Sequence, residues 1–271
     1  MAPPRTDSRG IVAASDLFAR VRFRRRDPAE ALRPYVEHYW LIDWDLTEPY
    51  EAQVVPHPCV NIVFQRDEEG GDVGEVAGVG SGLFTRKLSG RGRVCGAQFR
   101  PGGFRPFLPD RPVSDLTGLR LPLTEVYPGS APVSGAVLGA RSQDARVAAF
   151  DAFLLSLAPA PDALAERAMA AADRVRRDRS VRRVDELAEA VGLSVRSLQR
   201  LFATHVGVSP KWAILRYRIH EALERAGAGR AIDWAELAVE LGYSDQAHLV
   251  RDFTTRVGVP PTAYAQALTT P

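Results

Sequence analysis

The sequence is poor in cysteine and contains no long apolar run. Its two cysteines, Cys59 and Cys95, are too few for a disulfide framework or a cysteine-based structural zinc site, and this content is typical of a protein in a reducing cytoplasm. The most apolar stretch, residues 147–158, contains Asp151 and is shorter than the roughly 18 residues that a membrane span requires. Because residues 1–26 carry arginines without an apolar run, we expect neither a secretion signal nor a membrane partner.

The chain also has almost no net charge, because 35 basic residues stand against 33 acidic ones. The two ends differ, however: residues 174–271 hold 15 basic and 11 acidic residues (net +4), whereas residues 1–173 hold 20 and 22 (net −2). The C-terminal part is therefore mildly basic. With 271 residues, of which 45% are apolar and 25% charged, the composition indicates a globular protein of one or two domains.

Residues 28–141 are predicted to form a β-rich domain. Stretches rich in aromatic and β-branched residues alternate there with proline and glycine, a pattern typical of short strands. These stretches are residues 36–46, 53–65, 76–84 and 91–99. They favour a small antiparallel sheet or a barrel-like sheet. A turn or short helix after Phe99 is expected to carry Phe104 and Phe107 back onto it.

The other segments complete an α+β prediction. Residues 1–27 are predicted to be a loose basic arm with a helical turn near residues 16–20, and residues 109–141 to be surface loops. Residues 142–161 are expected to be a linker helix and the domain boundary, because the helix stops at two prolines. Residues 162–271 are predicted to form an all-α domain.

An internal repeat is the strongest signal in the sequence. With an offset of 50, Leu187, Ala188, Gly192 and Ser194 recur as Leu237, Ala238, Gly242 and Ser244. With an offset of 51, Leu198, Arg200, Phe202, Gly207, Val208 and Pro210 recur as Leu249, Arg251, Phe253, Gly258, Val259 and Pro261. Each copy has the pattern of a helix, a tight turn with glycine and a second helix, which is the helix-turn-helix motif.

The exposed side chains of the second helices suit DNA. In this motif the second helix enters a major groove, where arginine can donate paired hydrogen bonds to guanine and glutamine can pair with adenine. The predicted outer faces carry Arg196, Gln199, Arg200 and Thr204 in the first copy and Asp245, Gln246, His248 and Arg251 in the second. Ser194 and Ser244 are expected to cap these helices and to leave backbone N–H groups near phosphates.

A long helix over residues 210–225 is predicted to hold the two copies apart. Two recognition helices on one side of a duplex must lie about one DNA turn, ~34 Å, apart. Lys211, at the start of this helix, is expected to contact phosphate regardless of sequence. A single such motif is also a common packing unit, but two copies in the basic half of the chain favour sequence-specific DNA binding.

Two long segments of the helical half, LAEAVGLSVRSLQRLFATHVGVSPKWAILRYRIHEA and LAVELGYSDQAHLVRDFTTRVGVPPTAY, carry a family resemblance. Residues 162–267 resemble the AraC/XylS family of bacterial transcription regulators. The resemblance implies a unit that places two motifs in successive major grooves, in a transcription activator or repressor whose partners are double-stranded DNA and RNA polymerase. It also implies base contacts from Arg196, Gln199, Arg200, Gln246, Ala247, Val250 and Arg251.

The second motif departs from the family pattern. Leu249 stands where the family often has Phe, Thr254 where it often has a basic residue, and Ala265 where Arg is common. These changes remove expected phosphate contacts. We therefore expect weaker DNA contact from the second motif.

The β-rich half is similar to a domain that precedes this DNA-binding unit in some relatives, through the segments YVEHYWLIDWDL, PHPCVNIVF and FRPGGFRPF. The resemblance implies either small-molecule sensing or homodimerisation. The residues predicted to bind such a ligand are His38, Trp40, His57, Cys59 and Phe99. Aromatic residues of this kind also fill cores, so a ligand site and a plain core both stay open.

Two other hypotheses use overlapping residues. A cysteine-based sensor would respond to oxidation or alkylation of Cys59 or Cys95, and a metal-dependent barrel enzyme would use His57 and Cys59 with a metal. No acid/base pair, phosphate loop or complete nucleophile–base set is found in the sequence. We therefore expect no enzyme activity, no resident metal and no cofactor.

Overall fold

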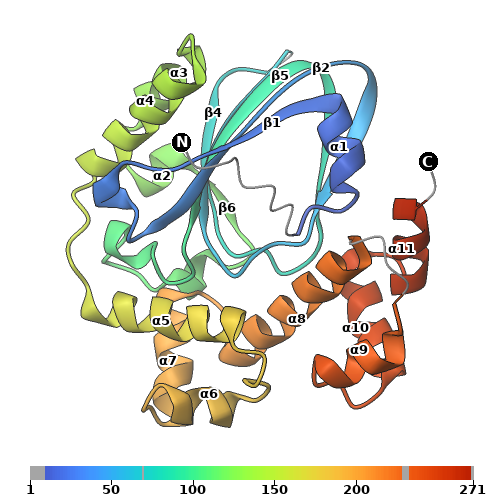
Figure 1. The fold of residues 1–271 in the computed structure, drawn as a ribbon. Helices are drawn as coiled ribbons and strands as arrows, with labels where there is room; N and C mark the ends of the chain where they lie inside the picture. Colours follow the sequence, from blue (N-terminus) through green and yellow to red (C-terminus); the bar gives the residue numbers. More distant parts are fainter. Residues whose placement is uncertain (1–9, 69, 228–231, 270–271) are drawn as a thin grey trace.

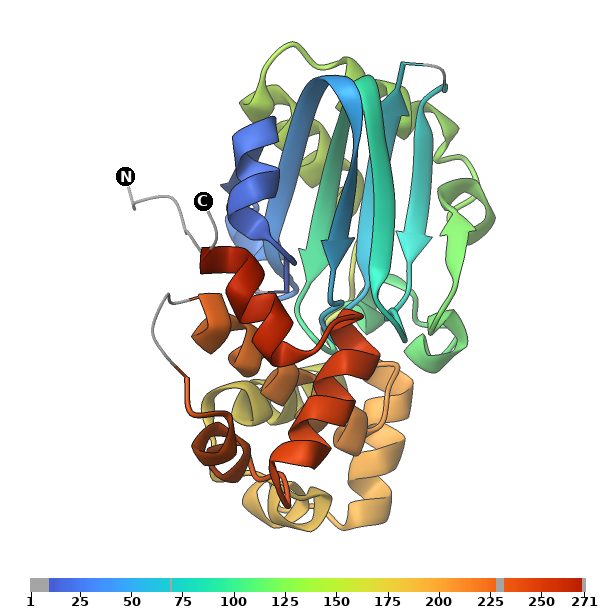
Figure 2. The same cartoon turned by 90° about the vertical axis from the view of Figure 1, so that its right-hand side faces the viewer.

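A β-sheet domain and a helical domain lie one above the other (Figures 1 and 2). The computed structural model describes residues 10–68, 70–227 and 232–269. Within them the sheet precedes the helical domain along the chain. The predicted α+β class, with an antiparallel sheet before an all-α unit, is therefore confirmed.

The described strands form one open sheet of six, in the order β1-β2-β5-β3-β4-β6, and every neighbouring pair is antiparallel. The strands are β1 Val21–Arg26, β2 Val36–Val54, β3 Asn61–Asp67, β4 Val73–Ala77, β5 Phe84–Phe99 and β6 Arg120–Pro122. The strand predicted over residues 53–65 is divided between β2 and β3. Pro56 and Pro58 lie in the division, and neither can donate a ladder hydrogen bond.

Residues 10–26 correct the prediction of a loose arm. Helix α1 spans Ala14–Arg20, as the expected helical turn suggested, and β1 pairs with β2 from Val21 opposite Trp44 onward. Val21 and Phe23 pack into an apolar cluster, so the strand has the two-residue period of a half-buried strand that its arginines obscured. Residues 1–9 of the expected arm lie outside the described residues.

The helices after the sheet cover one of its faces. They are α2 Leu123–Val126, α3 Ala131–Gly139 and α4 Gln143–Ser156, so part of the predicted loop region 109–141 is helical. Phe150 of α4 is fully buried and stacks on Tyr39 at 4.9 Å between ring centroids. Helix α4 thus belongs to the core of the sheet domain and is not a linker, because its apolar stripe is buried there. The boundary follows it, at residues 157–162.

The predicted turn after Phe99 is a 3-10 helix over Arg105–Phe107. It returns Phe104 and Phe107 to the sheet as expected, since their rings contact that of Phe99 edge-on at 4.9 and 5.2 Å.

The C-terminal domain is helical throughout its described part. Its helices are α5 Ala163–Arg177, α6 Val184–Ala190, α7 Val195–His205, α8 Pro210–Gly227, α9 Trp234–Glu240, α10 Gln246–Val257 and α11 Pro261–Thr269. Two apolar cores form, one around α5, α6 and α7 and the other around α9, α10 and α11, and both extend onto α8. No described helix combines the length and apolarity needed to cross a membrane.

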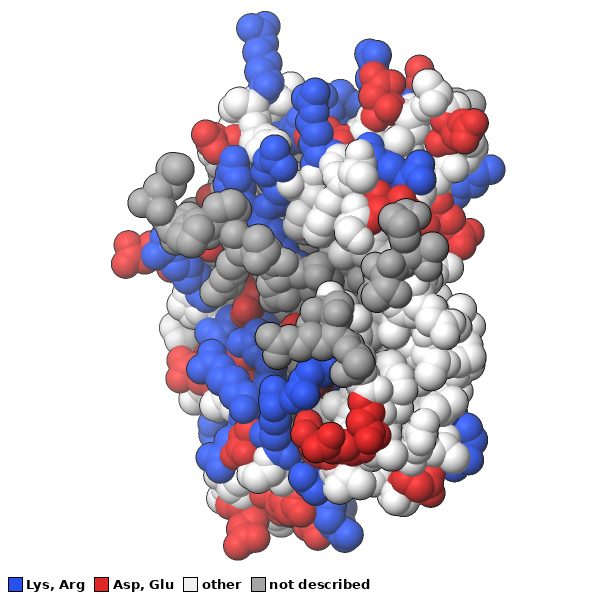
Figure 3. Space-filling model, turned by 45° about the vertical axis from the view of Figure 1, so that its right-hand side comes forward, with Lys and Arg blue, Asp and Glu red and all other residues white. Residues whose placement is uncertain are grey.

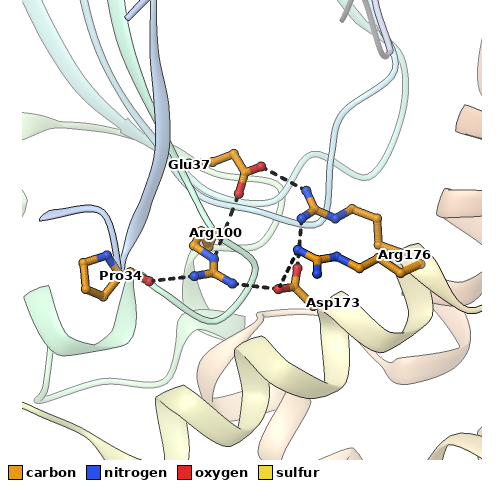
Figure 4. A network of polar contacts seen from close by, with 6 residues as sticks. Pro34, Glu37, Arg100, Asp173 and Arg176 are labelled. Carbon is orange, nitrogen blue, oxygen red and sulfur yellow. Dashed lines mark hydrogen bonds and ion pairs between the residues drawn. The ribbon is translucent and has the colours of Figure 1, made fainter. Parts of the chain in front are cut away.

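A ring of charges joins the two domains (Figure 4). Arg100, just after β5, approaches Asp173 of α5 at 2.6 Å, and Arg176 of α5 approaches Glu37 of β2 at 3.0 Å. Arg176 also pairs with Asp173 at 3.1 Å. These side chains are largely shielded from solvent, so the pairs are less screened than surface ion pairs. The first helix of the helical domain is therefore attached firmly to the sheet.

Candidate nucleic-acid interface and ligand cavity

The turns of the two helix-turn-helix motifs have the same backbone hydrogen-bond pattern. In the first, α6 and α7 flank the turn, where Leu193 N–H donates to Ala188 C=O at 2.9 Å. In the second, α9 and α10 flank the turn, and Tyr243 N–H donates to Ala238 C=O at the same distance. Gly192 and Gly242 have φ values of +64° and +73°, a conformation that favours glycine. The sequence repeat is thus a structural repeat.

Helix α7 presents its predicted face to solvent. Ser194 Oγ accepts a hydrogen bond from Ser197 N–H at 3.1 Å and caps the helix as predicted. Leu198 and Phe202 are fully buried on the opposite side. Arg196, Gln199 and Arg200 are exposed. The helix is therefore held by its apolar side while its polar side stays open to a partner.

Helix α10 begins one residue later than the repeat suggests. The capping group is the carboxylate of Asp245, which accepts from His248 N–H at 2.7 Å. Ser244 is not the cap; its hydroxyl lies 3.2 Å from Asp245 Oδ2 and 3.2 Å from His248 Nδ1. The extra residue of the second copy moves the capping position, which corrects the prediction for Ser244.

Most of the predicted DNA-contacting residues lie at the surface. Exposed are Ser194, Arg196, Gln199, Arg200, Lys211, Ser244, Gln246, Ala247, His248 and Arg251, and Val250 is half-buried. The guanidinium groups of Arg196 and Arg200 make no hydrogen bond or ion pair with any residue that the structure describes. Their donors are available to a partner.

Charged side chains are unevenly spread over the face shown in Figure 3. Basic side chains gather at its lower left, where acidic side chains lie among them, and few charged side chains lie at its lower right. On this face the basic side chains therefore do not form one continuous surface.

A cavity of about 220 Å³ lies on the face of the sheet opposite α3 and α4. Its walls include Trp40, Val63 and Val94 of neighbouring strands, and the polar residues His38, Asn61 and Gln98 lie in one row across them. A Cβ atom on Gly96 would lie 2.2 Å from the Trp40 indole. Because Gly96 has no side chain, the Trp40 indole can lie over this position of the sheet and form part of the cavity wall.

The cavity contains four of the five predicted ligand residues, namely His38, Trp40, His57 and Cys59. Phe99 does not line it. Its side chain is fully buried in the cluster beneath α4, on the other face of the sheet. Cys95, Ala97 and Phe99 of β5 belong to this cluster, whereas Val94 and Gln98 line the cavity, and the irregularity opposite Phe99 lies in β2, between Val36 and His38. The two-residue alternation along β5 therefore accounts for the position of Phe99, and its prediction as a ligand residue was wrong.

The two cysteines and the histidines His38 and His57 do not form one site. Cys95 lies in the cluster beneath α4, whereas Cys59 lines the cavity. Burial raises the pKa of each thiol to about 12, so neither has the thiolate character of a reactive cysteine. His57 stacks on His220 of α8, with ring centroids 4.1 Å apart. Among the described residues no three His, Cys, Asp or Glu side chains form a group that fits a metal ion.

Two families match separate parts of the chain. Residues 187–267 match a family described as a helix-turn-helix domain, and they contain the second motif and all of the first except the start of α6. The C-terminal domain is an AraC-type helix-turn-helix domain. Residues 24–122, which extend from the second half of β1 to the end of β6, match a domain of unknown function (DUF6597). The predicted family resemblance is confirmed, and the chain is a DNA-binding transcription regulator in its general class.

The chain is also similar to several solved structures. ToxT from Vibrio cholerae has 13% identity and a TM-score of 0.44, with 86% of this chain and 98% of that chain covered. ToxT with a bound unsaturated fatty acid has 15% identity and a TM-score of 0.41, with 85% and 95% covered. The C-terminal domain of AraT, a response regulator from Geobacillus stearothermophilus, has 21% identity and a TM-score of 0.36, with 39% and 88% covered. No curated protein matches the sequence.

Sequence reasoning missed two arginines inside the AraC-type domain. Arg216 of α8 is 2% exposed, lies 4.3 Å over the Trp212 ring and donates to Ser81 C=O of the sheet domain at 3.0 Å. Burial lowers its pKa to about 10. Arg218, one residue beyond Tyr217, donates to two backbone carbonyls. Their position between the buried Ile214 and Ile219 was the available signal, because an arginine on an apolar helix face usually has a fixed partner.

Proposed function

We propose that this protein controls transcription by binding one side of a DNA duplex through both motifs, and that a small molecule in the sheet-domain cavity regulates this binding. The paired motifs and their exposed arginine and glutamine side chains support the first part. The second part rests on a physical connection between the cavity and the two motifs.

That connection is the segment between β4 and β5. Gly78 and Gly80 line the cavity, while Val79 between them is fully buried in the core of the first motif. Leu83 of the same segment packs against the core of the second motif. A molecule that shifts this segment would therefore act on both motifs at once. This shared segment is the observation that carries the proposal.

A second connection runs through the cavity wall at His57. Its ring stacks on His220 of α8 with an interplanar angle of 16°. His220 Nε2 also lies 3.3 Å from the carbonyl oxygen of Pro56, another cavity residue. Because α8 connects the two motifs, the position of this helix depends on the cavity wall.

The cavity suits a small ligand. Its volume of about 220 Å³ is below the roughly 300–1,000 Å³ of sites for drug-sized molecules. Besides apolar side chains and the row of His38, Asn61 and Gln98, the lining includes Gln65 and three arginines, Arg25, Arg86 and Arg120. Such a lining would orient a compact molecule that has an apolar body and several hydrogen-bonding atoms. A homodimer, contact with RNA polymerase, activation of transcription and action in the cytoplasm stay predictions from the sequence.

Two measurements test the proposal. Selection from random duplexes with the full chain at about 0.15 M salt should enrich a site with two separate half-sites. Absence of any sequence preference would contradict DNA recognition. A thermal-shift screen should then find compounds that raise the unfolding temperature by mass action and change the Kd for the selected site. Trp40→Phe should reduce the rise in unfolding temperature that a compound causes, whereas Trp212→Phe, a substitution outside the cavity, should not. If the compound raises the unfolding temperature of both variants as much as that of wild type, it does not bind in the cavity.

A further inference from the structure

The two motifs are connected by more than helix α8. Arg182 lies just before α6, the first helix of the first motif, and Gly242 lies in the turn of the second motif. A Cβ atom on Gly242 would lie 2.7 Å from Arg182 Cδ, so the two segments are in close contact. Arg182 Nη2 also donates to the carbonyl of Glu240, the last residue of α9, at 3.2 Å.

Arg218 occupies the junction of these segments and α8. Its Nη2 donates to Arg182 C=O at 2.6 Å and its Nη1 donates to Gly242 C=O at 3.3 Å. One planar guanidinium thus joins both motifs to the middle of α8. Arginine suits this position because its donors are fixed in one plane, whereas a lysine ammonium is a point charge on a flexible stem.

Each end of this connection is anchored within its own motif. The backbone N–H of Arg182 donates to Glu186 of α6 at 2.6 Å. On the other side, the Arg218 guanidinium lies 5.5 Å from the Tyr243 ring centroid, and Tyr243 Oη donates to Asp252 of recognition helix α10 at 2.8 Å. A displacement of either motif would therefore break hydrogen bonds at Arg218.

We propose that Arg218, with Arg182, sets the separation and angle of the two recognition helices and so selects the spacing of the two half-sites in DNA. Both are positioning residues, and the inference rests on the proposed DNA binding by both motifs. One inserted base pair moves a half-site by about 3.4 Å and rotates it by roughly 35° around the duplex. A rigid pair of motifs cannot follow this change, whereas a loosened pair can.

The test uses the full chain and the duplex selected by it, with one or two base pairs inserted or removed between the half-sites. For wild type we expect Kd to rise at least about tenfold for each change, because one motif loses its contacts. For Arg218→Lys and Arg182→Gln we expect this spacing penalty to fall about tenfold, since charge-assisted hydrogen bonds between the motifs are lost. Arg174→Gln is the matched control, because among the described residues the Arg174 guanidinium pairs with Asp178 of its own segment and with no residue of either motif.

The outcomes separate the two proposals. A variant that is only less stable would bind duplexes of every spacing more weakly by the same factor. If the variants fold and their spacing penalty is unchanged, the proposed role of Arg218 and Arg182 is wrong. If Arg218→Lys does not fold, Arg182→Gln, which removes an exposed side chain, decides the question. If wild type selects a site but tolerates every spacing, this inference is wrong and DNA recognition stands. If wild type selects no site, the proposed function itself fails.

Discussion

Arginine serves two different purposes in the helical domain. Arg196 and Arg200 are exposed, and their side chains make no contact by hydrogen bond or ion pair with a described residue. Arg216 and Arg218 instead donate to backbone carbonyls and are partly or wholly buried. Burial and the position of carbonyl groups decide which arginines are structural and which can meet DNA.

Substitutions of Arg200 and of Lys211 should therefore affect DNA binding in different ways. Arg200→Ala is expected to lose about 1–3 kcal/mol of preference at one base pair, because paired donors to a base edge are removed. Lys211→Ala should weaken binding to all duplexes alike and reduce the salt dependence, because it removes a phosphate contact. Kd measurements on single-base variants of the selected site at two salt concentrations distinguish them. Equal loss on every sequence for Arg200→Ala would contradict its role in base recognition.

The two thiols should be inert in the folded protein. Since burial raises the pKa of Cys59 and Cys95 to about 12, only about one thiol in ten thousand is ionised at pH 8. Iodoacetamide should therefore modify them only at the rate of unfolding, and rapidly in denaturant. Mass spectrometry of the time course measures this. Rapid modification of the native protein with a change in DNA affinity would restore the cysteine-sensor hypothesis.

At the scale of single elements, local chemistry determines where the recognition helices begin. Ser194 caps α7, and Asp245, not Ser244, caps α10. Comparison of the two repeats pairs Ser194 with Ser244, because the extra residue of the second copy follows Ser244, at the start of the helix. The helices were predictable because their periodic apolar side chains are local signals, but the capping residue depended on backbone geometry at the turn.

Removal of these caps gives a direct comparison. Ser194→Ala should cost about 1 kcal/mol of stability, and Asp245→Ala should lower the unfolding temperature more than Ser244→Ala. The bond from His248 N–H lowers the pKa of Asp245 below 3.8, its value in an unfolded chain. The carboxylate therefore stabilises the fold above about pH 4, and this contribution is lost as pH falls through the lowered pKa. Thermal unfolding at pH 7 and pH 3 measures this; a larger effect of Ser244→Ala would contradict the assignment.

At the scale of the whole molecule, the sheet domain completes the cores of the helical domain. Val79 is buried with α5, α6 and α7, and Val55 is buried with the core of the second motif. Thr117 Oγ1 also donates to Gly207 C=O at 2.6 Å, just after α7. The domains are therefore expected to unfold together.

Val79→Asp should separate them. It would place an unpaired charge in an apolar core, at a cost of several kcal/mol, and the single unfolding transition should divide into two. Val73→Asp is the matched control, because Val73 of β4 is 56% exposed. Calorimetry and limited proteolysis between residues 157 and 162 provide the measurements. One unchanged transition in Val79→Asp would show that this contact does not join the domains.

The two motifs, their exposed faces and the α+β order of the domains could be predicted from the sequence, because helix period and turn glycine are local signals and the repeat is visible in the residues themselves. The folded structure was needed to show that α4 belongs to the sheet domain, that Cys59 and Cys95 lie on opposite faces of the sheet, and that Arg218 joins the two motifs. These facts depend on contacts between residues far apart in the chain, such as Phe150 with Tyr39 and Arg218 with Gly242. Local sequence patterns do not show which distant residues pair, because burial of the same apolar stripe is equally favourable against the sheet domain and against the helical domain.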